Sequence, residues 1–252
     1  MRRKKSLIRI TAARYIQILS FVSAFFSLSI PAYSQEEFVA PPARYITTIP
    51  FVLLSGGIVI VRATIDDSQD SLNFVLDTGS GGISLDSLTC DYLKFEKKPS
   101  EKVVRGIAGM KQVEFTYDHT LNMKGISIQH LDFHINDYEI LTSAYGIRIN
   151  GIMGYSFLRR YIVNIDYDSL HINVLTPGTI KYPKGGYLMR PQFTTLPMQS
   201  AMVRDNTDVN AKFYFDSGAG LCMLLNDDLV QDSSLLSKKR KVFPTEAEGL
   251  GG

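Results

Sequence analysis

Two short segments of this 252-residue chain place the same turn after an apolar run. Residues 74–80 read FVLDTGS, and residues 213–219 read FYFDSGA. In each segment three apolar residues, typical of a buried strand, lead into Asp, then Thr or Ser, then Gly. The glycine permits a tight turn directly behind the aspartate. A fold that brings the two segments together would therefore create a pair of carboxylates on rigid platforms.

Further landmarks recur in the same order and indicate an internal duplication. Residues 47–51 (TTIPF) recur as residues 194–198 (TTLPM), an offset of 147, and the two aspartates are offset by 139. Residues 106–109 (GIAG) recur as residues 249–252 (GLGG), an offset of 143, which is the weakest match. Two copies of one supersecondary unit leave such a pattern.

Residues 1–34 have the pattern of a signal peptide. Six basic residues and no acidic ones accompany an apolar stretch at 15–30, and the small-x-small pattern of Ala32 and Ser34 precedes Gln35. The alternative is a membrane anchor, but about 16 residues interrupted by polar ones fall short of the ~20 that span a bilayer. We expect cleavage before Gln35 and export to the periplasm or extracellular space, without a stable membrane anchor.

Net charge excludes one class of partner. Six of the 27 Lys and Arg lie in residues 1–34, which leaves 21 basic against 25 acidic residues and a formal net charge of −4 in the rest. Nucleic acid binding therefore has no electrostatic basis. The basic run at residues 238–241 is interpreted as a solvated loop.

The remaining sequence predicts an all-β protein in two units. Apolar runs at 58–61 and 74–76 and a hairpin around Asp168 indicate strands, and short helices are expected to start near residues 84–88 and over 155–161. Pro and Gly between residues 176 and 190 indicate a linker. The expected domains are a signal peptide at 1–34, a first β-unit at 35–175, a linker at 176–190 and a second β-unit at 191–252.

The Asp turns resemble the active-site loops of aspartic proteases of the retropepsin and pepsin-like type. The resemblance implies a bilobed all-β fold with Asp77 and Asp216 as catalytic residues and a peptide or protein as substrate. In that family an apolar-apolar-Gly strand crosses behind the turn, and Gly154 ends such a strand in the first unit only. The first lobe is therefore expected to be complete and the second partial.

The resemblance also assigns supporting roles. Thr78 and Ser217 would lock the two turns together, and a glycine hairpin would form a flap over the substrate, although a plain hairpin turn is an equal alternative. The residues implied are Thr78, Gly79, Ser80, Ser217 and Gly218 in the loops, Gly106, Ile107, Ala108 and Gly109 in the flap, and Ile152, Met153 and Gly154 in the crossing strand.

A close carboxylate pair shares one proton, so one member is charged and activates water while the other is protonated. Ser80 can donate a hydrogen bond to its aspartate and Ala219 cannot. We therefore expect Asp77 to be the charged base and Asp216 to hold the proton. No cofactor is implied.

Two rival readings remain open. The partial second lobe would leave an inert peptide-binding fragment if the pair does not assemble. Alternatively, the first lobe would be active as a symmetric homodimer that pairs two copies of Asp77. Related envelope proteins often carry a PDZ-like domain after the second lobe, so we expect such a region to be missing here if the chain is a fragment of a protein of that kind.

Metal and disulfide signals are weak. His130, Asp132 and His134 share one face of an expected strand, but alternating polar residues on a solvated face explain them more simply. No metal site is expected. Cys90 and Cys222 are not equivalent in the repeat, and buried free thiols are favoured over a disulfide.

Overall fold

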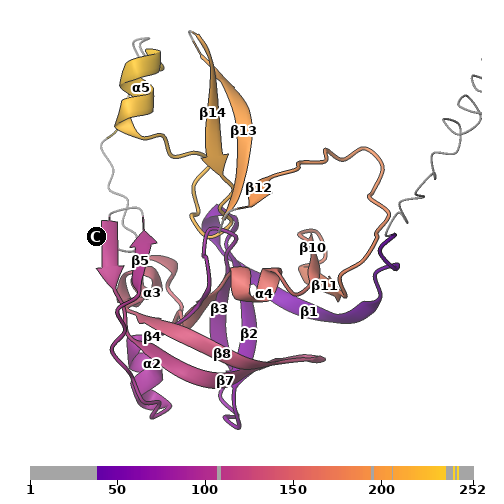
Figure 1. The fold of residues 1–252 in the computed structure, drawn as a ribbon, viewed down its shortest axis with the longest axis vertical. Helices are drawn as coiled ribbons and strands as arrows, with labels where there is room; N and C mark the ends of the chain where they lie inside the picture. Colours follow the sequence, from indigo (N-terminus) through magenta and orange to yellow (C-terminus); the bar gives the residue numbers. More distant parts are fainter. Residues whose placement is uncertain are drawn as a thin grey trace, which may run out of the picture. The chain divides into compact units, whose positions relative to one another are not determined.

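The computed structural model of the protein describes residues 39–106, 109–193, 196–205, 207–236, 241 and 243. Every helix and strand within these ranges belongs to one compact unit, Pro41–Gly252 (Figure 1). In the described part of the chain no helix is long and apolar enough to cross a membrane.

Most of the strands form one nine-stranded sheet in the order β10-β11-β1-β2-β3-β9-β4-β8-β7. A further pairing of β2 with β7 closes the segment from β2 to β7 into a barrel. The strands are β1 (Tyr45–Leu53), β2 (Val59–Ile65), β3 (Leu72–Leu76), β4 (Ile83–Asp86), β7 (Phe115–Met123), β8 (Ile126–Asn136), β9 (Gly151–Met153), β10 (Ile162–Asp166) and β11 (His171–Leu175). The predicted all-β fold of the aspartic-protease type is confirmed.

Smaller elements complete the fold. A hairpin of β5 (Val103–Gly106) and β6 (Gly109–Gln112) forms a separate two-stranded sheet, and β12 (Gln192–Phe193), β13 (Pro197–Arg204) and β14 (Asp208–Tyr214) form a three-stranded one. The helices are a 3-10 turn η1 (Ser55–Gly57), α2 (Ser87–Tyr92), α3 (Glu139–Tyr145), α4 (Tyr155–Leu158) and α5 (Asp227–Ser233).

The main core fills the barrel with alternate side chains of its strands. Phe74, Leu76 and Phe133 are at most 1% exposed, and the Phe74 and Phe133 ring centroids lie 6.4 Å apart. Each large apolar side chain buried in this way stabilises the fold by roughly 1.5–3 kcal/mol. Because β3 is buried on both faces, it is a rigid support for the residue that follows it, Asp77.

Strand β9 lies between the two strands that flank the first Asp turn. It runs parallel to β3, with Leu76 opposite Met153, and antiparallel to β4, with Ile83 opposite Met153. A side chain at Gly151 would overlap the ring of Phe74, so this narrow position requires glycine. The chain therefore crosses behind residues 77–82 and closes the sheet there.

The predicted helix near residues 84–88 starts later than expected. Residues 83–86 form β4, because β9 and β8 hydrogen-bond it on either side, and α2 begins only at Ser87. The carboxylate of Asp86 caps that helix by accepting from the Thr89 N–H at 3.0 Å. The expected helix over 155–161 is the single turn α4.

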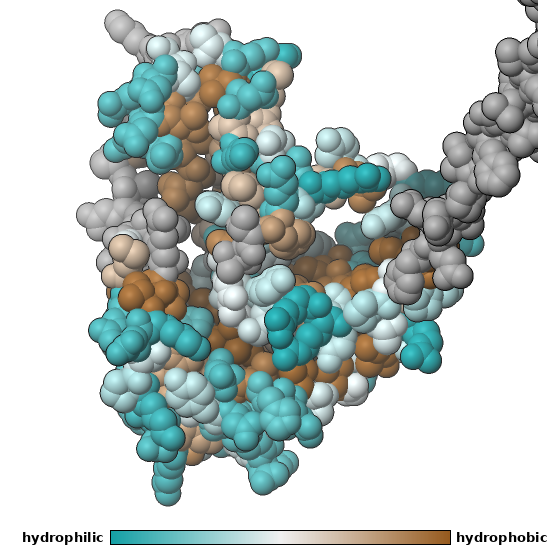
Figure 2. Space-filling model, in the orientation of Figure 1, coloured by the Kyte–Doolittle hydropathy of each residue, from teal (hydrophilic) through white to brown (hydrophobic). Residues whose placement is uncertain are grey.

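The three-stranded sheet is far more exposed than the barrel. Along β14 exposed and half-buried residues alternate, and among the described residues its one strand partner is β13. Apolar side chains reach the surface in the region of β14 and α5 (Figure 2). This second platform therefore offers Asp216 less shielding from water than β3 offers Asp77.

Candidate active site

The first Asp turn is held from behind by β9. Asp77 follows β3, and its N–H donates to the Met153 carbonyl at 3.0 Å. Its own carboxylate turns back to accept from the Gly79 N–H at 2.6 Å. With 9% of its surface exposed, Asp77 is a buried carboxylate at the edge of the core.

The second Asp turn repeats this local geometry on the exposed sheet. Phe215 donates from its N–H to the Pro197 carbonyl at 2.9 Å, which fixes the end of β14. The Asp216 carboxylate accepts from the Gly218 N–H at 2.8 Å, as Asp77 does from Gly79. Asp216 itself is exposed.

Two hydroxyl side chains join the turns reciprocally. The Thr78 hydroxyl accepts from the Ser217 N–H at 3.0 Å and donates to the Phe215 carbonyl at 2.6 Å. The Ser217 hydroxyl accepts from the Thr78 N–H at 3.1 Å and donates to the Leu76 carbonyl at 3.1 Å. Four hydrogen bonds therefore fix one turn against the other, and all of them lie within one chain.

Each carboxylate lies against the glycine of the opposite turn. A methyl group added at Gly79 would overlap the Asp216 carboxylate, and one added at Gly218 would overlap the Asp77 carboxylate. The two glycines are required here for close approach between the turns. The structure thus brings together all of the predicted loop residues except the side chain of Ser80.

Burial favours the protonated form of Asp77. Burial, the charge of Asp216 and a hydrogen bond with its side chain together raise the pKa of Asp77 to about 7. Backbone hydrogen bonds from Gly79 and Gly218 oppose this rise but are outweighed. The expectation that Asp77 is the charged member is therefore wrong, because desolvation by the complete barrel dominates.

The Ser80 hydroxyl does not stabilise a charged Asp77. Among the described residues no hydrogen bond joins that hydroxyl to a carboxylate; the residue acts through its backbone. Its carbonyl accepts from the Tyr155 N–H at 2.9 Å, and its N–H lies 3.4 Å from the Asp77 carbonyl. A side chain at Gly154, directly after β9, would overlap the Ser80 backbone, so the chain packs tightly against the turn there.

The remaining predicted elements have different outcomes. Strand β9, with Ile152 and Met153, lies directly behind the first turn as the resemblance implied. In the hairpin of β5 and β6, Gly106 is paired with Gly109, whereas Ile107 and Ala108 lie outside the described residues, as does the 249–252 repeat.

The histidine and acidic residues of β8 do not converge. His130 has a positive φ of 57° and pairs with Asp118 at 2.7 Å, whereas His134 is half-buried and lies opposite Ser84 of β4. Burial lowers the pKa of His134 to about 4, so it is neutral above that pH. Within the described ranges no cluster of three or more His, Cys, Asp or Glu is arranged to hold a metal.

Both cysteines are free thiols, but only one matches the expectation. Cys90 is fully buried in the main core, and burial raises the pKa of its thiol. Cys222 is exposed, so the expectation of a second buried thiol is wrong. The exposed position follows from the sparse second sheet, which provides little core around the segment after Asp216.

Two neighbours of the aspartate pair were not predicted from the sequence. A methyl group at Gly56 in η1 would lie 2.7 Å from the Gly220 carbonyl oxygen, so these two turns are in contact. Tyr145, at the end of α3, also faces Gly220. The consecutive glycines 56 and 57 could have predicted a turn with positive φ, whereas no local sequence pattern indicates a role for Tyr145.

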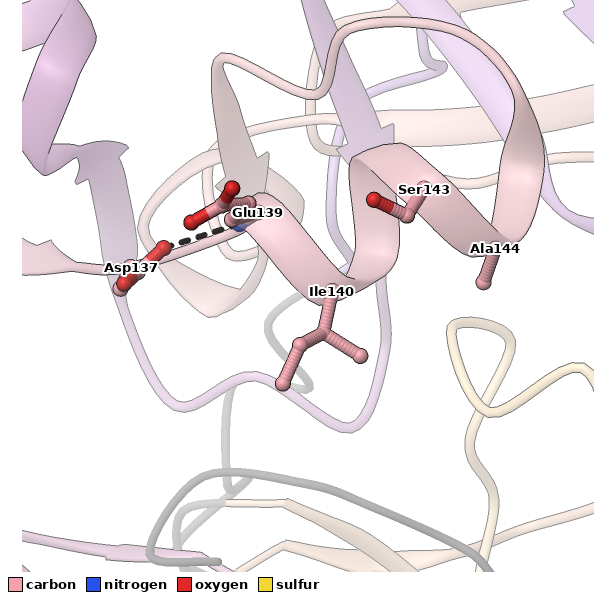
Figure 3. Close-up of a pocket in the computed structure, with 5 residues that line it drawn as sticks. All are labelled: Asp137, Glu139, Ile140, Ser143 and Ala144. Carbon is pink, nitrogen blue, oxygen red and sulfur yellow. Dashed lines mark hydrogen bonds between the residues drawn. The ribbon is translucent and has the colours of Figure 1, made fainter.

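Helix α3 also borders an open cavity of about 640 Å³ (Figure 3). Asp137 precedes the helix, and its carboxylate accepts from the Glu139 N–H at 2.9 Å. The lining residues are Asp137, Glu139, Ile140, Ser143 and Ala144. This cavity is acidic at one end and does not include either aspartate of the pair.

Comparison with known families agrees with the geometry. Residues 61–157 match the family model of aspartyl proteases. The match runs from β2 through β9, so it includes Asp77 and Gly154 but not Asp216. A search of curated proteins finds no match to the chain.

Proposed function

Because residues 61–157 match the aspartyl protease family model, we propose that the chain is an endopeptidase that hydrolyses peptide bonds with Asp77 and Asp216 as its catalytic pair. The single observation that carries this proposal is the reciprocal locking of the two turns. The four hydrogen bonds of Thr78 and Ser217 hold both carboxylates over each other's glycine. Such rigidity would be unnecessary for two ordinary surface turns.

The asymmetric burial supports a division of labour. Below about pH 7 Asp77 retains its proton, so Asp216 is the base that takes a proton from the attacking water. The water oxygen adds to the amide carbonyl carbon, and Asp77 donates a hydrogen bond to the developing oxyanion. When the carbon–nitrogen bond breaks, the amine leaves with the proton that Asp77 supplies.

Hydrolysis of denatured casein tests the proposal. Asp77→Asn keeps the shape of the side chain and removes the acid, so we expect turnover to fall by at least about 10³-fold, as for loss of a principal acid–base group. A pepstatin-type statine peptide should inhibit the wild type. Wild-type turnover that Asp77→Asn leaves unchanged contradicts the proposal.

Casein hydrolysis also addresses the inert alternative. An unmodified protein that neither cleaves casein nor binds the statine peptide would be a binding or structural module. The hydrogen bonds between the turns favour the active reading, because they align both aspartates without a second chain.

Export is part of the proposal and depends on the sequence pattern of residues 1–34. The site would then act outside the cytoplasm on peptides or unfolded proteins. N-terminal sequencing of the protein from expressing cells should return Gln35. Recovery of Met1 instead would show that the segment is retained.

A further inference from the structure

Tyr145 is held firmly at the end of α3. Gly146, with a φ of 68°, ends the helix and donates from its N–H to the Thr142 carbonyl at 3.0 Å. The Tyr145 ring packs against a small core cluster formed by Ile58, Ile60, Val75, Tyr138 and Ile149. The hydroxyl therefore has a defined position at little entropic cost.

That hydroxyl faces the aspartate pair across Gly220. A methyl group built on Gly220 would lie 3.5 Å from the Tyr145 oxygen, a van der Waals contact. Desolvation and the charges of Asp77 and Asp216 raise the pKa of Tyr145. The side chain is half-buried, so it lies at the border of the site rather than inside the core.

The Tyr145 hydroxyl has no hydrogen-bond partner within the described residues, unlike the other tyrosine of the same cluster. Tyr138 bonds the Ser84 hydroxyl at 2.6 Å and the Asn136 amide at 3.1 Å, so its hydroxyl is fully used. A half-buried O–H that keeps its proton beside two carboxylates is a donor available to a bound molecule.

We propose that the Tyr145 hydroxyl donates a hydrogen bond to a main-chain carbonyl of the bound peptide, beside the scissile bond, and so positions the substrate. The inference rests on the proposed peptidase function. Main-chain carbonyls recur at every residue of an extended peptide, and the negative aspartate pair disfavours an acidic side chain at this place. Tyr145 is thus a substrate-binding residue rather than a member of the acid–base pair.

The expected kinetic effect follows from the position of the hydroxyl. Its proposed partner is a carbonyl beside the scissile bond, which does not change charge in the reaction. Binding of this kind is uniform between ground state and transition state and appears in KM. Loss of one neutral hydrogen bond costs about 0.5–1.5 kcal/mol, so Tyr145→Phe should raise KM about 2- to 13-fold and leave kcat unchanged.

Tyr161→Phe is the matched control. Tyr161 is also half-buried, its ring packs on Phe157 at a centroid distance of 5.2 Å, and no hydroxyl partner is found for it within the described ranges. It directly precedes β10, at the far end of the sheet order from β4 and β8. The control should keep wild-type KM and kcat, and both variants should melt at the wild-type temperature.

The test measures casein hydrolysis and the Kd of pepstatin A, a statine peptide, for wild type and both variants. Weaker pepstatin binding and a raised KM in Tyr145→Phe alone support the inference. Wild-type values of both in Tyr145→Phe overturn it and leave the peptidase proposal standing. A wild type that cleaves nothing contradicts the peptidase proposal, and pepstatin binding then tests the Tyr145 contact by itself. Weaker pepstatin binding in Tyr145→Phe, but not in Tyr161→Phe, still supports the contact. Pepstatin binding that is equal in the wild type and Tyr145→Phe, or absent from both, overturns it.

Discussion

The two Asp turns share their local chemistry and differ in what surrounds them. Asp77 follows a strand with neighbours on both sides, and 9% of its surface is exposed. Asp216 follows β14, which in the described part of the chain pairs with β13 alone, and it is exposed. The same internal N–H to carboxylate bond is present in both turns. Local sequence thus builds the turn, and the surrounding sheet decides which carboxylate holds the proton.

The segments after the turns show the same contrast. Residues 83–86 form the buried strand β4, and Asp86 then caps α2. Residues 223–226 also lead into a capped helix: the Asn226 side chain caps α5 by accepting from the Leu229 N–H at 3.1 Å. Yet Met223 and Leu224 are more than half exposed and form no strand. A strand needs partners, and within the described residues only the first segment has them.

Outside the two aspartates, the largest expected effect comes from displacing the second turn relative to the first lobe. Gly56→Ala places a methyl group 2.7 Å from the Gly220 carbonyl oxygen, so one turn must move. Because a displacement of about 1 Å costs roughly 10²-fold in rate, casein turnover should fall by about that factor. Gly57→Ala is the control: its φ of 82° is equally strained, but nothing lies within 4 Å of the added methyl group.

Both glycine variants should lose similar stability, about 1–2 kcal/mol from a left-handed alanine. Casein turnover should fall in Gly56→Ala alone, because only there does the added methyl group displace a turn. Equal turnover in the two variants would show that the contact between Gly56 and Gly220 does not align the pair.

A smaller effect distinguishes the two carboxylates by stability. The pKa of Asp77 is about 7 in the folded protein and near 4 when unfolded, so the native state binds the extra proton. The contribution of Asp77 to the free energy of unfolding is therefore most favourable below pH 4, falls as pH rises from 4 to 7, and stays reduced above pH 7. Asp77→Asn should stabilise the protein at pH 8, by up to about 4 kcal/mol, and leave it unchanged at pH 4.

Thermal melting at pH 4, 6 and 8 checks this expectation. Asp216→Asn removes only the contribution of its charge and hydrogen bond to the pKa of Asp77 and leaves burial, the largest cause. It should therefore retain most of the pH dependence. A flat stability profile for Asp216→Asn, with a normal profile for Asp77→Asn, would assign the proton to Asp216 instead.

The smallest effect is expected at Ser80. Since its hydroxyl bonds no carboxylate within the described residues, Ser80→Ala should leave the acidic limb of the kcat/KM profile where it is. Ser217→Ala provides the contrast, because the Ser217 hydroxyl makes two hydrogen bonds between the turns. Losing them should lower the free energy of unfolding by about 1 kcal/mol for each bond. An upward shift of the acidic limb in Ser80→Ala would restore the hydroxyl to an electrostatic role.

The sequence was informative where a local pattern has one physical solution. Apolar runs that end in Asp-Thr-Gly and Asp-Ser-Gly predicted both turns, and the apolar-apolar-Gly pattern at Gly154 predicted the strand behind the first. The charge state of Asp77 could not be predicted in this way, since it depends on desolvation by strands distant in sequence. Tyr145 was missed for the same reason: only the fold brings it to Gly220, 75 residues away.

The activity of Asp216→Asn tests the central claim most directly, which is that the two turns of one molecule form the catalytic pair. The account predicts that Asp216→Asn abolishes casein hydrolysis as completely as Asp77→Asn does, and that mixing the two variants restores nothing. Full activity of Asp216→Asn would contradict it, because the active site would then pair two copies of Asp77 across a homodimer.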